Sequence, residues 1–233
     1  MYGELTIPAR FNGPPTSGNG GYSAGALAEA LAPTGGAVQV TLRMPPPLGV
    51  PMLLNESRTA CLYDGATVLE AKPLDDDLEI VEPVTYDEAA EASSRYPGLV
   101  THPFPTCFTC GPGRDDGLSI FPGRIDSRRA AATWTPDASL SDTDEVGIPV
   151  TWAAMDCIGG WSSDIDKRPM VLGRMACRVD AAPRVGEPHV VVGRWLGTEG
   201  RKTYTLATMY DADDRIVARA GHIWIEVDVS QFG

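Results

Sequence analysis

The chain of 233 residues carries 31 acidic and 19 basic side chains, and this net charge of -12 argues against a nucleic-acid partner, because neutralising phosphates takes clustered Lys and Arg. Its hydrophobic content of 43% is ordinary for a globular protein, and no apolar run approaches the roughly 20 residues of a membrane helix. Since the N-terminus also lacks a basic region followed by an apolar stretch, we expect a cytoplasmic protein with no membrane partner.

The first third of the chain predicts a strand, a helix and then antiparallel strands. GELTIPARF supplies the first strand, and SAGALAEALA supplies a helix that starts near the glycine pair Gly20 and Gly21. AVQVTLRM predicts the next strand, and residues 52–74 predict two strands about a turn. Asp64-Gly65 is a strong signal for a short hairpin within that stretch.

Residues 75–117 predict a linker with internal order. The segment is acidic at its start and is interrupted by prolines, and it contains one candidate helix from Tyr86 to Tyr96. Thr85, followed three residues later by Glu88, predicts a capping box at the start of that helix. The linker ends in HPFPTCFTCGP, which is its most unusual segment chemically.

The rest of the chain repeats the order of the first third. RRAAATWTP predicts a strand and VTWAAMDCIGGW a helix from about Val150, followed by strands in VLGRMACRVDA, HVVVGRWL, KTYTLATMYD and RIVARAGHIWIEV. Apolar and polar residues alternate most clearly in Thr203 to Tyr210 and Ile216 to Val227. One helix for every several strands predicts an α+β fold.

Two short motifs mark this repeat. GGYSAG at Gly20 to Gly25 is echoed by GGWSSD at Gly159 to Asp164, and aligning the two glycine pairs brings the following elements into the same order. The second pair is predicted to lie later in its helix than the first. We therefore divide the chain into a first unit over residues 1–74, the linker, and a second unit over residues 118–233.

Two tandem copies of strand, helix and antiparallel strands, with a glycine pair near the helix in SGNGGYSAGALAEAL, resemble the double-hotdog acyl-CoA thioesterases of the type II group, a thioesterase-like superfamily. The resemblance covers both copies but not the linker. It implies a tandem hotdog whose two central helices pack on one continuous antiparallel sheet, beside a tunnel that binds an acyl thioester. It also implies a homo-oligomer.

The glycine pair of the first copy fits the stabilisation of an oxyanion. Backbone N–H groups at a helix start carry positive potential, and Gly20 and Gly21 let a ligand approach closely. Ser17 or Asn19 would cap this helix. Alternatively, the segment is only a capped helix start that packs closely on the sheet.

The general base is harder to place from the sequence. Glu29 falls near the carboxylate position of single-hotdog relatives but one residue late, which turns it by about 100°, so we interpret it as a surface residue. Type II enzymes use an Asp on the strand after the second helix, with a Ser or Thr and a Gln from later strands. In this chain those positions fall near Gly173-Arg174, where no carboxylate matches, around Thr198 to Gly200, and at His222.

Asp156 is the remaining candidate, because it lies in an otherwise apolar helix where burial would raise its pKa. One hypothesis has Asp156 acting as general base on water, with His222 assisting from the facing strand. The alternative is that Asp156 bonds nearby backbone and His222 is an ordinary strand residue. The substrate groove would be lined by aromatic, glycine and cap residues, namely Tyr22, Trp152, Trp161, Gly159 and Gly160 together with Asn19, Gly20 and Gly21.

The five cysteines, an odd number, do not indicate a disulfide framework, so we expect reduced thiols. Cys107 and Cys110 form a C-x-x-C with His102 upstream, three possible zinc ligands where a structural site needs four. Cys157 could join them only if the linker folds over the second helix. Buried thiols, a redox pair, or Cys107 as a nucleophile with His102 as base remain open.

Two functions from different classes follow. The first is hydrolysis of acyl-CoA or a related thioester, with no cofactor apart from a possible structural zinc. The second is non-catalytic binding of an acyl thioester on the same fold. A hotdog dehydratase is weakened because no His is predicted beside either helix start. A serine hydrolase at Ser23 or Ser162 is weakened because neither serine is predicted on the sharp strand-to-helix turn of a nucleophile elbow.

Overall fold

The computed structural model describes residues 3–32, 36–75 and 78–232, so residues 76–77 of the predicted linker lie outside the described part. Three α-helices are present there: α1 (Gly20–Leu31), α2 (Tyr86–Ser94) and α3 (Ile148–Ser162). The first-half strands are β1 (Glu4–Thr6), β2 (Val38–Leu42), β3 (Pro51–Leu54), β4 (Ala60–Tyr63) and β5 (Ala66–Pro73). The later strands are β6 (Gly123–Arg124), β7 (Arg129–Trp134), β8 (Met170–Val179), β9 (His189–Glu199), β10 (Lys202–Tyr210) and β11 (Ile216–Glu226). None of the described helices has the length and apolar character needed to cross a membrane.

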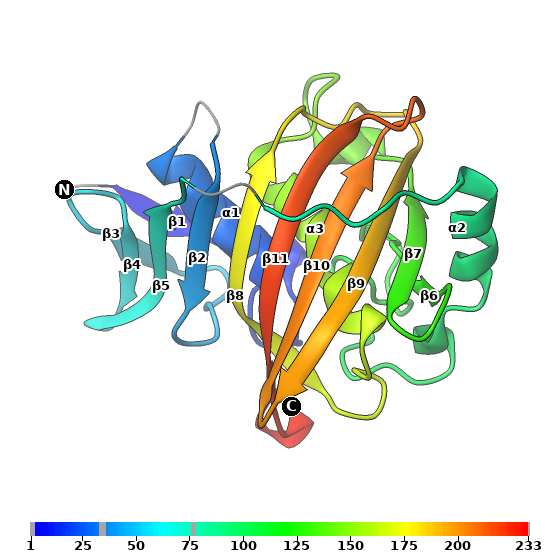
Figure 1. The fold of residues 1–233 in the computed structure, drawn as a ribbon. Coiled ribbons are helices and arrows are strands. Elements are labelled where there is room, and N and C mark those ends of the chain that lie inside the picture. The colour runs from blue at the N-terminus through cyan, green and yellow to red at the C-terminus, as the bar shows by residue number, and fades with distance from the viewer. Residues whose placement is uncertain (1–2, 33–35, 76–77, 233) are drawn as a thin grey trace.

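The described strands form one antiparallel sheet in the order β1-β3-β4-β5-β2-β8-β11-β10-β9-β7-β6 (Figure 1). Its two halves have the same internal arrangement, since β3-β4-β5-β2 in the first corresponds to β9-β10-β11-β8 in the second. The halves meet where β2 pairs with β8, which places Val38 opposite Cys177 and Val40 opposite Met175, all buried. This is the tandem hotdog predicted from the sequence.

The hairpins form where the turn residues predicted them. Between β4 and β5, Asp64 and Gly65 both have positive φ angles, of 50° and 76°, which matches the tight turn that Asp-Gly favours. Residues 52–74 nevertheless contain three strands rather than two, because Asn55 and the residues after it turn the chain between β3 and β4. Asn55 Oδ1 accepts hydrogen bonds from the N–H groups of Thr59 and Ala60.

Helices α1 and α3 lie side by side on one face of the sheet, and α3 is almost entirely buried. It begins two residues before the predicted Val150, because Pro149 suits the first turn of a helix. Gly159 and Gly160 fall in its last turn, whereas Gly20 and Gly21 open α1. The second glycine pair therefore lies late in its helix, as predicted, and the two motifs occupy opposite ends of their helices.

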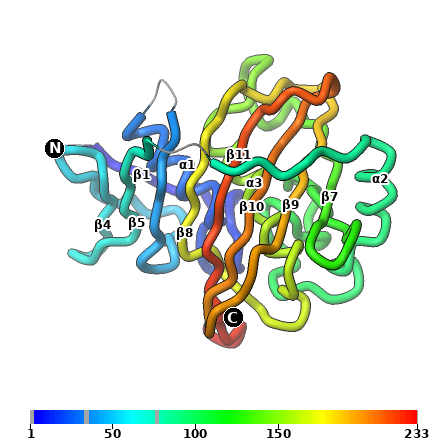
Figure 2. Tube along the Cα trace, viewed as in Figure 1, coloured from blue at the N-terminus to red at the C-terminus, as the bar shows by residue number. Residues whose placement is uncertain are grey.

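The linker wraps around the second half of the sheet (Figure 2). Its first part crosses the outer face of β11, β10 and β9, where the Val81 N–H donates to Thr208 Oγ1. Helix α2 then packs beside β7, and its predicted capping box is confirmed by reciprocal bonds between Thr85 and Glu88. The helix ends at Ser94 rather than Tyr96, because Pro97 disfavours a helical conformation at the residue before it. The linker finally returns to the helical face.

Candidate active site

A cavity of about 400 Å³ lies between the start of α1, the middle of α3, β8 and the returning linker. Its apolar wall comes from the sheet, the linker and the end of α3, with Phe104, Trp161, Met170, Leu172 and Trp224 as large side chains. Its polar groups include Asn19, His102 and Asp156. An apolar cavity of this size with a few convergent polar groups is typical of a small-molecule site.

Asn19 organises the polar wall from the start of α1. Its Oδ1 accepts the Tyr22 N–H at 2.8 Å, so Asn19 rather than Ser17 caps the helix. Its Nδ2 donates to Asp156 Oδ2 at 3.0 Å and to Thr109 Oγ1 at 3.3 Å. One buried amide therefore connects α1, α3 and the linker.

Asp156 supplies a buried carboxylate that is only 3% exposed. Its Oδ2 accepts the Gly21 N–H at 2.9 Å in addition to the Asn19 amide, while its Oδ1 has no hydrogen-bond partner among the described residues. Burial raises the pKa of Asp156 to about 7, although the bonds from Gly21 and Asn19 oppose the shift. It is the only carboxylate among the described residues that line the cavity.

The two glycines at the start of α1 have different environments. The Gly21 N–H is taken by Asp156, and a Cβ at Gly21 would lie 2.6 Å from the Trp152 carbonyl oxygen, so close packing explains this glycine. Gly20 lines the cavity, and a Cβ there would lie 2.7 Å from Leu172 Cβ. Of the two backbone N–H groups expected to bind an oxyanion, that of Gly21 is already occupied. Gly20 is therefore the remaining candidate.

Of the three aromatic residues expected to line the groove, only Trp161 does so. Tyr22 stacks on Phe11 with ring centroids 3.8 Å apart, and Trp152 packs against Gly25 of α1. The main apolar lining instead includes Leu172 and Trp224. The alternation of their strands could have indicated an inward face, but not which inward residues meet a cavity.

His222 lies between α3 and the sheet and does not line the cavity. Its Nδ1 is 3.2 Å from Thr205 Oγ1, and its ring packs against Gly159, where an added Cβ would lie 2.8 Å from Nδ1. Burial lowers its pKa to about 4, so the ring is neutral. Gly160 likewise packs on Ile165 and Trp224. The structure thus brings Asn19, Gly20 and Trp161 together around Asp156, and leaves His222 and the second glycine pair outside this group.

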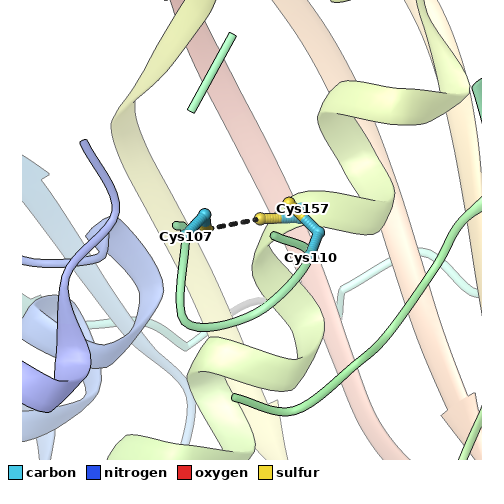
Figure 3. A group of neighbouring side chains, drawn as sticks. All are labelled: Cys107, Cys110 and Cys157. Carbon is cyan, nitrogen blue, oxygen red and sulfur yellow. Dashed lines mark hydrogen bonds between the residues drawn. The ribbon is translucent and has the colours of Figure 1, made fainter. Parts of the chain in front are cut away.

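The C-x-x-C segment forms the remaining wall, because the linker folds over α3 and brings Cys157 to Cys107 and Cys110 (Figure 3). Contacts with the Cys110 and Cys157 thiols, aided by backbone N–H groups, hold the pKa of Cys107 well below its usual range although burial opposes this. His102 Nε2 lies 3.4 Å from Cys110 Sγ. Thr109, which the sequence did not single out, ties the segment to α3 by donating to the Ala153 carbonyl at 2.9 Å.

The other predicted positions carry no reactive arrangement. Ser162 Oγ donates to the Gly159 carbonyl, and Ser23 is fully buried outside the cavity lining. The resemblance places a catalytic Asp near Gly173-Arg174, and Gly173 lines the cavity but has no side chain to offer. Glu29 is exposed on α1, as interpreted.

Comparisons with known proteins support the fold. No protein-family model and no curated protein matches the sequence. Among solved structures, the tesB protein of Mycobacterium avium subspecies paratuberculosis is 12% identical with a TM-score of 0.63, over 96% of this chain and 91% of that one. A conserved protein of unknown function with a hot dog fold from Alicyclobacillus acidocaldarius is 12% identical with a TM-score of 0.62, over 97% and 92%. Both likenesses span the full double unit.

Proposed function

We propose that this chain hydrolyses acyl-CoA or a related acyl thioester, with Asp156 as the general base. The observation that carries the proposal is the free Oδ1 of a buried carboxylate that lines an apolar cavity beside a helix start. The other oxygen of this carboxylate is held by Gly21 and Asn19, so the side chain is fixed in orientation. A pKa of about 7 suits a base that works near neutral pH.

The chemistry follows from this arrangement. The acyl chain occupies the apolar part of the cavity, and the thioester carbonyl points at the Gly20 N–H, where the helix start stabilises negative charge. Asp156 Oδ1 takes a proton from a water molecule, whose oxygen bonds to the carbonyl carbon. When the tetrahedral intermediate breaks its carbon–sulfur bond, Asp156 returns the proton to the leaving thiolate, which yields a carboxylic acid and a thiol.

The position of Asp156 also supports the proposal, because the strand that should carry the catalytic Asp has no carboxylate there. The strand position expected to carry a catalytic Asp falls near Gly173-Arg174, which holds no carboxylate, and both Gly173 and Asp156 line the same cavity. Asp156 of α3 can therefore supply a carboxylate to a cavity that receives none from β8. The catalytic group would then come from the helix rather than from the strand.

The test compares Asp156→Asn with Glu29→Gln on a panel of acyl-CoAs, following release of free thiol. Asn keeps the shape of the side chain but cannot accept the proton, so kcat should fall by about 10² to 10⁴. Glu29→Gln removes an exposed carboxylate from α1 and should match the wild type. Hydrolysis by Asp156→Asn at the wild-type rate would remove Asp156 from the mechanism.

One observation favours the alternative of a non-catalytic acyl-thioester binding protein. Asp156 already engages the Gly21 N–H and the Asn19 amide, which leaves fewer donors for an oxyanion than the sequence suggested. Calorimetry with a non-hydrolysable thioether analogue, alongside the hydrolysis panel, separates the two functions. Binding without turnover of any thioester would establish the binding protein. The cytoplasmic location, the homo-oligomer and the unit boundaries at residues 74 and 118 stay predictions.

A further inference from the structure

Three buried thiols from two segments far apart in the chain converge (Figure 3). All three belong to residues that line the cavity. The sulfur atoms of Cys107, Cys110 and Cys157 all lie within 4.8 Å of one another, and those of Cys107 and Cys157 are 3.7 Å apart. Zn–S bonds of about 2.3 Å at tetrahedral angles place two thiolates about 3.8 Å apart. The spacing of these thiols therefore matches zinc coordination.

The turn that presents Cys107 and Cys110 is built for this convergence. The Gly111 N–H donates to the Cys107 carbonyl at 2.9 Å, which closes the C-x-x-C segment into a tight loop. A Cβ at Gly111 would lie 2.5 Å from both the Cys107 nitrogen and the Pro105 carbonyl oxygen, so the loop requires glycine. Thr109 fixes the loop to α3 through the Ala153 carbonyl.

Two side chains direct N–H groups at the sulfur atoms. Asn19 Nδ2 approaches Cys107 Sγ at 3.8 Å, and His102 Nε2 approaches Cys110 Sγ at 3.4 Å. His102 Nδ1 accepts the Phe104 N–H at 2.9 Å, so in the neutral ring the proton is on Nε2 and points at the sulfur. These donors favour thiolates, and His102 then supports a ligand rather than acting as one.

Three thiolates buried together in this way would need a positive charge beside them. The cavity lining contains one Arg or Lys among the described residues, Arg43, and its guanidinium pairs with Glu70 at 2.7 Å. All three cysteines line the cavity, so a metal bound by them would keep its fourth position on the cavity side. Zinc sites with three protein ligands characteristically leave one such position to water or substrate.

We propose that Cys107, Cys110 and Cys157 bind one Zn²⁺ through three thiolates, with the fourth position open to the cavity. The site does not depend on thioester hydrolysis, and its test measures metal rather than turnover. Loss of activity in Asp156→Asn and loss of zinc are therefore separate outcomes.

The test uses the full chain purified without a metal-binding tag, with zinc measured per chain by elemental analysis. The wild type should hold about one zinc. Cys107→Ala and Cys157→Ala should lose it, whereas Cys177→Ala, which removes a buried thiol on β8, should keep it. Replacement of the zinc by Co²⁺ should give the thiolate charge-transfer band and the intense visible absorption of a tetrahedral site.

The cobalt spectrum of the wild type decides the question even if a cysteine variant fails to fold. A wild type with no zinc and no cobalt–thiolate band after reconstitution would overturn the proposal. So would intact mass under non-reducing conditions that shows a disulfide among these three cysteines in freshly purified protein. Equal loss of zinc in Cys177→Ala would also overturn it, because the effect would then not be specific to the cluster.

Discussion

Gly21 and Asp156 join the two central helices at a single point, where the Gly21 N–H donates to Asp156 Oδ2 at 2.9 Å and an added Cβ on Gly21 would lie 2.7 Å from Asp156 Cβ. One turn later, Gly25 packs equally closely on Trp152. The missing side chains let α1 approach α3 until a backbone N–H reaches the carboxylate. The close packing of the two helices therefore also fixes the orientation of the Asp156 side chain.

Gly21→Ala should destabilise the protein. Alanine normally favours a helix over glycine by about 1 kcal/mol, so a simple propensity effect would be stabilising. Here the methyl group would meet the Trp152 carbonyl at 2.6 Å, and we expect a net loss of about 1 to 3 kcal/mol in the free energy of unfolding. Urea denaturation measures it, and an unchanged or raised midpoint would show that the helices can separate at no cost.

Two substitutions of Asn19 should distinguish its contribution to stability from its positioning of Asp156. Asn19→Ala removes both the cap on Tyr22 and the donor to Asp156, so stability should fall by about 1 to 3 kcal/mol. Asn19→Ser keeps a capping oxygen but loses the amide donor. We expect Ser to recover most of the stability while kcat on a thioester stays low, and recovery of both together would mean that Asn19 only caps the helix.

His222 should make the protein sensitive to acid. Its folded-state pKa of about 4 lies below the value of about 6.5 expected in the unfolded chain, so the unfolded state binds the proton first as pH falls. The free energy of unfolding should decrease between pH of about 6.5 and 4, by about 3 kcal/mol in total from this group, and should be unaffected by it above that window.

His222→Gln replaces the ring with a neutral side chain and provides the comparison. Carboxylates titrate in both proteins, so the relevant quantity is the difference between the two stability curves across the acidic range. That difference should narrow as pH falls, because only the wild type acquires the proton. Parallel curves would show that His222 is protonated equally easily in both states.

Arg43 should contribute to binding a phosphate-bearing carrier. It is the one Arg or Lys among the described residues of the cavity wall, and it is half-exposed and paired with Glu70. Arg43→Gln should raise KM for an acyl-CoA by up to about fivefold, with kcat little changed. The same acyl group on N-acetylcysteamine carries no phosphate and should be unaffected. An equal rise for both substrates would assign Arg43 to the shape of the cavity mouth.

Local signals were sufficient for most of the elements, although they missed one strand within residues 52–74. The capping box at Thr85 and Glu88 and the Asp64-Gly65 hairpin each depend on contacts within a few residues, so the sequence specified them directly. The order of strands and helices in the two halves also followed, because periodicity and turn residues recur in the same sequence. The internal symmetry of the sheet is the outcome of that repeated order.

The site depended on contacts that no local pattern encodes. The composition of its helix marked Asp156 as buried, but only the packing of α1 on α3 showed that Gly21 bonds one oxygen and leaves the other free. His222 was expected near the same carboxylate, and the tertiary structure places it against Gly159 beneath the helix. Cys157 and Cys107 are 50 residues apart in the sequence, and they meet only because the linker folds back across α3. The sequence by itself determined the repeated elements and their order, while the tertiary structure decided which side chains share the cavity, because that depends on how the helices and the linker pack.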